Sequence, residues 1–324
     1  MRIVAMLTVK DLPREFTLTQ IKDLIKDGHA LYEPNDYGQV TDVGNDLFVK
    51  YGSRILKTEA LAMELVRTRT NLPVPGLLAY ISDEGDDATE RPRCGYLVMK
   101  KLPGIRLDRA LEGMDKAAED IVAQGIRHVL SELRSLDDPG RWGHVGKNGA
   151  LHGGEFKFRL SSDDPKICRP SSMQDLLDFT IAATGMEKLE SFLQHPNLKA
   201  RQEAQRCITM LASIDMSRPS VFSHGDLRPE NILVDPETYA ITGIIDWELA
   251  GWYPYFWNYS IAEFYQDQAR FRAPATIPIW ERIYKSAMPD YERESQSFGF
   301  LLTDIAFRGQ DWGWLNLPCD CCKD

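Results

Sequence analysis

The sequence lacks the features of a membrane protein or a nucleic-acid-binding protein. No stretch approaches the ~20 consecutive apolar residues that a membrane-spanning helix needs, and the apolar run at residues 3–7 is too short for a signal peptide. Lys and Arg number 38 against 48 Asp and Glu, giving a net charge of -10, and they form no stripe suited to a phosphate backbone. We therefore expect no membrane association and no nucleic-acid partner.

Cysteine is sparse and shows no pairing pattern. The six cysteines are Cys94, Cys168, Cys207, Cys319, Cys321 and Cys322. The first three stand far apart, and the last three crowd the C-terminal end without the second cysteine pair or histidine cluster of a metal site. The final four residues also lack the aliphatic middle of a prenylation signal. Reduced thiols in a cytoplasmic protein are the expectation.

The chain has neither the GxGxxG nor the GxxxxGK[ST] nucleotide motif, but it carries another phosphate-transfer pattern. HGDLRPENILVD runs from His224 to Asp235, and ITGIIDWE follows, ending at Glu248. Asp226 is a candidate base for a substrate hydroxyl. Asn231 and Asp246 offer the oxygen ligands that magnesium prefers. Phosphoryl transfer needs these parts, because its catalysis is mostly positioning and charge neutralisation.

Two apolar runs explain how these residues meet. Residues 232–234 and 241–245 are expected to form a strand hairpin, with Asn231 just before the first strand and Asp246 just after the second. The turn then folds both residues back beside Asp226. We expect His224 to orient the loop through the backbone; direct proton transfer by this residue is the less favoured alternative.

The distribution of helix and strand signals divides the chain. Before residue 100 we expect a helix that ends at Gly28, strands at 39–43, 46–51, 77–81 and 96–99, and a helix at 57–70. After residue 104 helical patterns dominate, at 107–111, 117–136, 173–184 and 198–214. The sequence thus predicts an α+β protein with a small antiparallel-sheet lobe at 1–101 and a larger, mainly helical lobe at 102–324. The long polar stretch at 137–172 is a candidate functional loop.

The small lobe contributes further candidates. Lys50 ends an apolar strand and can meet nucleotide phosphates, although an edge-strand lysine would explain it too. Glu59 or Glu64 of the next helix is its candidate partner, with Glu59 favoured. The turn at Gly44 can cover phosphates with backbone N–H groups, and an ordinary hairpin explains it equally well. Residues 99–102 are the expected connection between the lobes.

Acidic and aromatic residues cluster after Asp246. Glu248, Glu263 and Asp267 are interleaved with Trp247, Trp252, Tyr253, Tyr255, Phe256, Trp257 and Tyr259. Aromatic faces beside carboxylates suit an ammonium group, at ~0.5–2 kcal/mol per contact. This favours a small amine-bearing alcohol as the phosphate acceptor, and packing of the helical core is the alternative reading.

The motifs together resemble a known family. HGDLRPENILVD…ITGIIDWE is similar to the aminoglycoside phosphotransferase and choline kinase group, which shares the protein-kinase-like fold. FVKYG, KTEALAMELV, LPVPGLLAY and YLVMKKLPG resemble small-lobe segments of its fungal branch. The resemblance implies a bilobal protein-kinase-like fold, with ATP and Mg²⁺ as cofactors and the hydroxyl group of a small molecule as acceptor.

The resemblance also assigns roles by position. It implies that Asp226 is the catalytic aspartate and that Asn231 and Asp246 hold magnesium. Lys50 would contact the α and β phosphates with Glu59 as its partner. The backbone of Lys100 to Leu102 would hold adenine.

Two other functions fit the sequence less well. A nucleotide-binding scaffold without catalysis has no need to keep Lys50, Asp226, Asn231 and Asp246 together. A protein kinase is disfavoured because the loop reads HGD rather than HRD and neither DFG nor APE occurs around or after Asp246.

Overall fold

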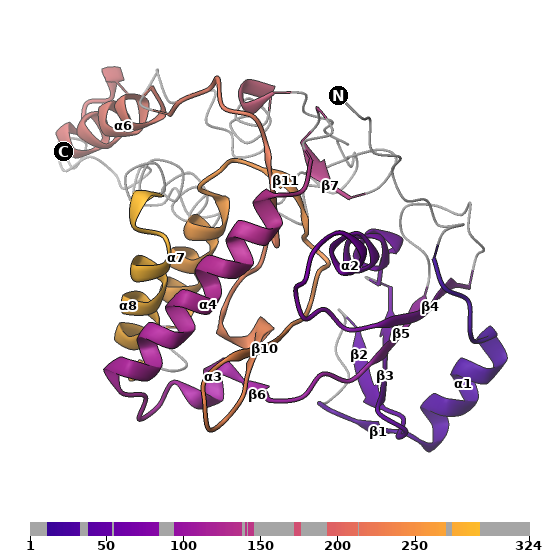
Figure 1. Ribbon diagram of the computed structural model, residues 1–324. Helices are drawn as coiled ribbons and strands as arrows, with labels where there is room; N and C mark the ends of the chain where they lie inside the picture. The colour runs from indigo at the N-terminus through magenta and orange to yellow at the C-terminus, as the bar shows by residue number, and fades with distance from the viewer. Residues whose placement is uncertain are drawn as a thin grey trace, which may run out of the picture.

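The computed structural model describes two lobes joined by one linker (Figure 1). It describes residues 12–32, 38–53, 55–83, 94–137, 140, 142–145, 172–175, 193–212, 214–269 and 274–291. The C-terminal cysteines, most of the stretch at 137–172 and all but the start of the helix expected at 173–184 lie outside these residues. None of the helices within them is both long and apolar enough to cross a membrane.

The N-terminal lobe is built on an antiparallel sheet of five strands in the order β1-β2-β3-β5-β4. The strands are β1 (His29–Ala30), β2 (Gln39–Asp42), β3 (Leu47–Gly52), β4 (Leu77–Ser82) and β5 (Gly95–Lys100). The β2–β3 turn contains Gly44, Asn45 and Asp46 at φ angles of 77°, 50° and 57°. Glycine, asparagine and aspartate tolerate this left-handed region best, so the sequence places the hairpin here.

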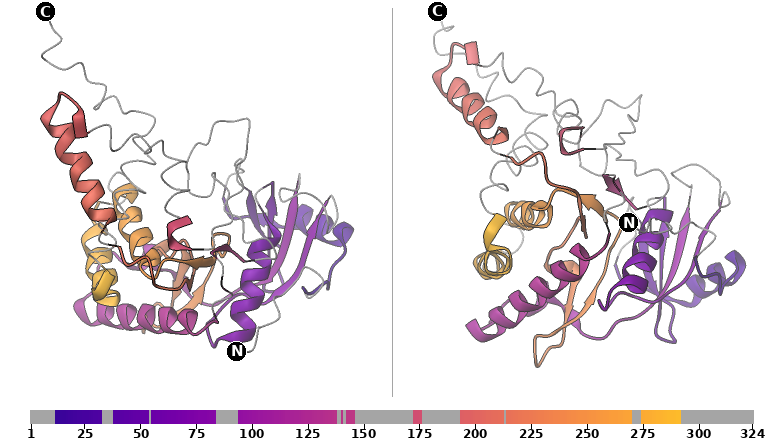
Figure 2. Two further views of the ribbon diagram at one scale, coloured as in Figure 1. Left: turned by 90° about the horizontal axis from the view of Figure 1, so that it is seen from above. Right: turned by 45° about the horizontal axis from the view of Figure 1, so that its top comes forward.

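Two helices cover opposite faces of this sheet (Figures 1 and 2). Helix α1 (Leu18–Asp27) begins with a reciprocal capping box between Thr17 and Gln20, and its Ile21 is fully buried against Val49 and Val98. Helix α2 (Lys57–Arg69) packs on the other face, with Leu97 in its cluster. Because Lys50 pairs with Leu97 across the sheet, its side chain lies on the α2 face.

The C-terminal lobe is mainly helical. Its helices are α3 (Leu107–Ala110), α4 (Lys116–Arg134), α6 (Leu198–Leu211), α7 (Trp257–Ala269) and α8 (Ile277–Ala287), with short 3-10 turns η3 (Pro229–Asn231) and η4 (Pro289–Tyr291). Helix α4 packs along α8, where the buried Glu119 meets the Arg282 guanidinium at 3.0 Å. The segments that hold Asp226 and Asp246 lie between α6 and α7 in the sequence.

Two small sheets carry those segments. One has the order β10-β9-β6, from β6 (Ile105–Arg106), β9 (Ile232–Val234) and β10 (Ile241–Ile244). The other has the order β7-β11-β8, from β7 (Gly143–His144), β8 (Val221–Ser223) and β11 (Gly251–Tyr253). The loop that holds Asp226 therefore leaves β8 and enters β9, and the segment at Asp246 leaves β10 and enters β11.

Hydrogen bonds tie the two lobes together around the linker. The Ile244 amide of β10 donates to the Pro73 carbonyl at 2.9 Å, and the Asn71 amide donates to Glu132 of α4 at 2.9 Å. Thr242 of β10 donates its hydroxyl to the carbonyl of Pro103 in the linker at 2.7 Å. The end of β10, two residues before Asp246, is thus fixed relative to the N-terminal lobe.

The predicted fold class is confirmed, and so are the long elements. The helices at 18–27 and 57–69, the hairpins β2–β3 and β9–β10, and helix α4 lie where the patterns predicted them, within a few residues. The short strands β1, β6, β7, β8 and β11 were missed, because two or three residues carry no readable alternation. The exact division at 101/102 remains a proposal.

Candidate functional site

The loop from His224 to Asn231 is shaped by Gly225 and Pro229. Gly225 has φ 83°, and a Cβ placed on it would lie 2.1 Å from the Leu249 carbonyl oxygen. Arg228, which precedes Pro229, is extended at φ -138°, as the proline ring requires. In this extended stretch Leu227 is buried at 1% exposure. The chain therefore turns Asp226 and Arg228 to the side opposite Leu227.

We expect Gly225→Ala to destabilise the fold more than Gly113→Ala does. Gly113 has nearly the same φ, 82°, but open space around its Cβ position. Both variants incur the ~1–2 kcal/mol cost of a left-handed alanine, and only Gly225→Ala adds a clash with backbone. Urea unfolding measures both losses, and equal losses would contradict the close approach of Leu249 to the loop.

His224 holds the loop against the Asp246 segment. Its Nε2 lies 3.0 Å from the Ile245 carbonyl, and the Asp226 amide donates to its Nδ1 at 3.3 Å. Its ring packs 4.5 Å from the Trp247 ring. Burial lowers the pKa of His224 to about 4. A neutral ring with Nε2–H donating and Nδ1 accepting fits both bonds, which supports the orienting role.

This burial predicts a pH dependence of stability. Between about pH 4 and its usual value of 6.5, His224 takes up a proton in the unfolded chain but not in the folded one, so stability falls as the pH falls through that window. When the pH is lowered from roughly 7.5 to 5, the unfolding free energy of the wild-type protein should fall by about 2 kcal/mol more than that of His224→Gln. Urea unfolding at the two pH values checks this, and parallel pH profiles would contradict it.

Two neighbouring side chains contact the same carboxylate oxygen of Asp226. Asn231 donates its Nδ2 to Oδ2 of Asp226 at 3.0 Å and to its carbonyl at 2.8 Å. The Nε of Arg228 lies 3.0 Å from the same Oδ2. About a fifth of the Asp226 side chain is exposed. The carboxylate is thus fixed in direction and still open to a substrate.

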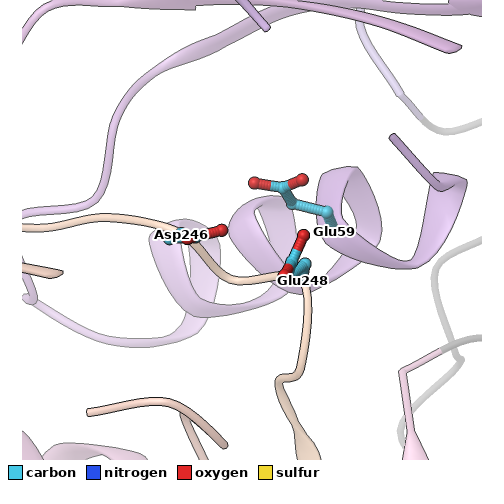
Figure 3. A group of neighbouring side chains, drawn as sticks. All are labelled: Glu59, Asp246 and Glu248. Atoms are coloured by element: carbon cyan, nitrogen blue, oxygen red, sulfur yellow. The ribbon is translucent and has the colours of Figure 1, made fainter. Parts of the chain in front are cut away.

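The second half of the site is a group of charged residues from both lobes (Figure 3). Lys50 Nζ lies 2.9 Å from Glu59 Oε1, 2.7 Å from Asp246 Oδ1 and 3.7 Å from Glu248 Oε2. Glu59 stands in the first turn of α2, whereas Glu64 pairs with Arg67 at 2.7 Å. The structure therefore brings Lys50 to Glu59, the favoured partner.

Mutual charge sets the protonation of this group. Burial alone would lower the pKa of Lys50, but Asp246 and Glu59 outweigh it and hold that pKa well above its usual range. Burial raises the pKa of Glu59. Burial acts likewise on Asp246, yet the charge of Lys50 brings its pKa below its usual range. Burial and the Asp246 charge raise the pKa of Glu248 to about 7.

The donor atoms fit a magnesium ion. Glu59, Asp246 and Glu248 each place one carboxylate oxygen within 4.8 Å of the other two. Glu59 uses both oxygens on Lys50, so Asp246 and Glu248 are the oxygens left for a cation. Asn231 donates through Nδ2, and its Oδ1 makes no hydrogen bond within the described part of the chain. Amide and carboxylate oxygens are ligands that Mg²⁺ accepts.

Most of these site residues lie in a stretch of the chain that matches a known protein family. A model of the phosphotransferase enzyme family matches residues 54–274, more than half of the chain. The chain belongs to this family. It is similar to aminoglycoside 3'-phosphotransferases of Streptomyces ribosidificus, at 54% identity over 41 residues, and Streptomyces fradiae, at 34% over 74 residues. These segments cover 11% and 22% of the chain and only 16% and 28% of the two relatives.

Solved structures of the phosphotransferase enzyme family share the fold. A thermostable mutant of aminoglycoside phosphotransferase APH(4)-Ia, in ternary complex with ADP and hygromycin B, matches with a TM-score of 0.57 at 14% identity, over 91% of this chain and 92% of that one. The GDP complex of aminoglycoside 2'-phosphotransferase-IIIa matches with a TM-score of 0.55 at 13% identity, over 93% and 92%. Identities this low establish the bilobal fold alone.

The linker offers a backbone donor at the position where the resemblance implies that adenine binds. The amides of Lys100 and Lys101 are used by the Gly76 and Asp46 carbonyls, at 2.9 and 2.8 Å. The Leu102 amide makes no hydrogen bond within the described residues. It can therefore donate to a purine edge. Of the predicted residues Lys100 and Leu102, only Leu102 therefore offers a backbone donor here, because the Lys100 amide is already bonded to Gly76.

The structure keeps Gly44 apart from the charged group. Its turn precedes Leu47, which pairs with Lys100 at the linker end of the sheet, roughly 10 Å along β3 from Lys50. The Leu31 amide just after β1 donates to the Val40 carbonyl, and Val40 pairs with Lys50 across the sheet. The chain at Leu31 therefore reaches the row of the sheet that holds Lys50, which Gly44 does not.

The aromatic cluster behaves as core. The seven aromatic residues from Trp247 to Tyr259 named above are all buried, at 7% exposure or less. Tyr253 stacks on Trp257 at 4.8 Å, and Tyr259 meets Tyr284 of α8 edge-on at 5.1 Å. These contacts favour the packing alternative over an aromatic cage for an ammonium group. Asp267 has a side chain outside the described part.

Sequence reasoning missed two site residues. Glu248 was taken as a substrate-side carboxylate, but it faces Lys50. Arg228 was not singled out, although it contacts Asp226. Both residues stand two positions after a predicted site aspartate, in D-x-E and D-x-R patterns. In the extended stretch before Pro229 that spacing puts Asp226 and Arg228 on one side, so this signal was available for Arg228. No such rule covers Glu248, because Asp246 has a left-handed backbone at φ 66°.

Proposed function

We propose that this phosphotransferase moves the γ-phosphoryl group of a nucleoside triphosphate, with Mg²⁺, to a hydroxyl of a small molecule. The observation that supports this most strongly is the meeting of Lys50, Asp246 and Glu248 from two lobes, with Asn231 donating to Asp226 beside them. Solved relatives hold ADP, AMP-PNP or GDP, which fits ATP as donor and leaves GTP open.

The roles follow from position and charge. Lys50, held by Glu59, would bind the non-transferred phosphates, and Asn231, Asp246 and Glu248 would hold magnesium. The metal would supply charge neutralisation on the phosphates. Asp226 orients the acceptor hydroxyl and receives its proton. The acceptor oxygen forms a bond to the γ-phosphorus, the bond from that phosphorus to the bridging oxygen breaks, and the nucleoside diphosphate leaves with the bond's electron pair.

An amine-bearing alcohol is the proposed acceptor class. Hygromycin B is bound in one solved relative, and the curated relatives carry aminoglycoside phosphotransferase names. The net charge of -10 favours a cationic substrate as well. The likeness of the small-lobe segments to the choline kinase group and the fungal branch is part of this proposal.

A panel of purified acceptors tests the proposal. Nucleoside diphosphate release is followed with aminoglycosides, simple amino alcohols and neutral sugars of similar size. We expect turnover with amine-bearing alcohols. Turnover confined to neutral alcohols would refute the acceptor class while keeping the phosphotransfer. Nucleotide binding without release on any acceptor would favour the scaffold alternative.

A further inference from the structure

We infer that Arg228 is a further catalytic residue, whose guanidinium contacts the transferred γ-phosphoryl group beside Asp226. The inference rests on the proposed function, because it needs a nucleoside triphosphate in the site. It starts from one contact, the 3.0 Å between Arg228 Nε and Asp226 Oδ2.

The local sequence fixes this arginine in place. Pro229 keeps Arg228 in an extended conformation, and its carbonyl accepts the Asn231 amide at 2.9 Å. Buried Leu227 anchors the opposite side of the loop. A side chain on so constrained a backbone loses little freedom when it binds a ligand.

The site holds more carboxylates than Lys50 alone can pair with, which favours a second cation such as Arg228. Four carboxylates face the site, from Glu59, Asp226, Asp246 and Glu248, and Lys50 is committed to three of them. Asp226 must approach the acceptor hydroxyl, so its negative charge stands next to the incoming phosphoryl oxygens. Arg228 neutralises that charge where Lys50 does not reach.

Arg228 is also accessible to a ligand on the Asp226 side of the site. About a third of the Arg228 side chain is exposed, which leaves it reachable by a phosphate.

Guanidinium is suited to this contact. It stays charged at every working pH and presents several N–H donors in a planar fork that matches phosphate oxygens. In the transfer step the bond to the leaving oxygen breaks as the bond to the acceptor oxygen forms, and Asp226 takes the proton. Arg228 exchanges no proton and stabilises the charge on the equatorial oxygens.

Binding measurements separate this role from simple orientation of Asp226. Calorimetry with Mg²⁺ compares AMP-PNP, which has a γ-phosphoryl group, with ADP, which has none. For Arg228→Met we expect AMP-PNP affinity to fall by about 10-fold or more, the usual loss for a charged hydrogen bond, while ADP affinity changes less than about 3-fold. Arg228→Lys keeps the charge but loses the planar set of N–H donors. Its AMP-PNP affinity should therefore lie between those of the wild type and Arg228→Met.

The matched control is Arg67→Met. Arg67 lies eight residues after Glu59 on α2, and its loss removes a guanidinium from another mostly buried carboxylate, Glu64. It should leave both affinities unchanged. Equal affinity changes for AMP-PNP and ADP in Arg228→Met and Arg228→Lys would overturn the phosphoryl contact and leave the proposed function standing. A wild-type protein that binds neither nucleotide would overturn the proposed function and this inference together.

Discussion

Asp226→Asn should lower phosphotransfer turnover by about 10²–10⁴-fold, the range for a lost general base. The substitution keeps the shape of the side chain and removes the charge that receives the hydroxyl proton. Asp226 lies beside the ligands proposed for magnesium and is not one of them, so Mg–nucleotide affinity should stay within a few-fold of wild type. Steady-state turnover with an active acceptor and calorimetry with AMP-PNP measure the two effects.

The control for Asp226→Asn is Asp120→Asn on the exposed side of α4, where the carboxylate pairs with Lys116 on the surface. It should not alter turnover. If Asp226→Asn kept wild-type turnover, Asp226 would have no part in the chemistry. If it lost nucleotide binding to the same extent as turnover, its role would be in assembling the site.

Asp246→Asn should abolish most Mg-dependent nucleotide binding, and turnover with it. Asp246 has φ 66°, a left-handed conformation that asparagine also tolerates, so this variant removes charge without adding the strain that alanine would bring. The change takes away a magnesium ligand charge and the closest carboxylate to Lys50, at 2.7 Å. We expect an affinity loss of at least about 10-fold, since charged contacts of this kind are worth ~1.5–3 kcal/mol.

A titration of Mg²⁺ at fixed AMP-PNP distinguishes loss of metal from loss of fold. Asp246→Asn should need far more Mg²⁺ than wild type to reach half-saturation, while its urea unfolding stays cooperative. Asp235→Asn alters a carboxylate in the turn of the same β9–β10 hairpin and should leave the Mg²⁺ requirement unchanged. Unchanged Mg²⁺ dependence in Asp246→Asn would remove this residue from the metal site.

The sequence predicted most of the fold because its long elements carry strong local signals. The capping box at Thr17 and Gln20, the Gly44–Asn45 turn and the apolar runs on either side of 235–240 each encode a structure within a few residues. The short strands β7, β8 and β11 form only because distant segments pair, so no local pattern announces them. The partner of Lys50 was predicted as Glu59, and the structure pairs the two.

The limits of prediction at the site have a physical cause. Spacing placed Asn231 and Asp246 beside Asp226, but it gave no direction for side chains on irregular segments. Glu248 therefore turned out to face Lys50, and Leu31 rather than Gly44 lies level with Lys50 across the sheet. The aromatic run after Asp246 reads equally as a cage or as core, and only its burial favours core.

The central claim is that Asp226 and the charged group around Lys50 transfer a γ-phosphoryl group to a small-molecule hydroxyl. Its most direct test incubates wild-type protein and Asp226→Asn with Mg²⁺, γ-labelled ATP or GTP, and a mixture of aminoglycosides and other metabolites. Label should appear on a small molecule with the wild-type protein and be absent with the variant. Label that stays on the nucleotide, or that moves equally with both proteins, would contradict the account.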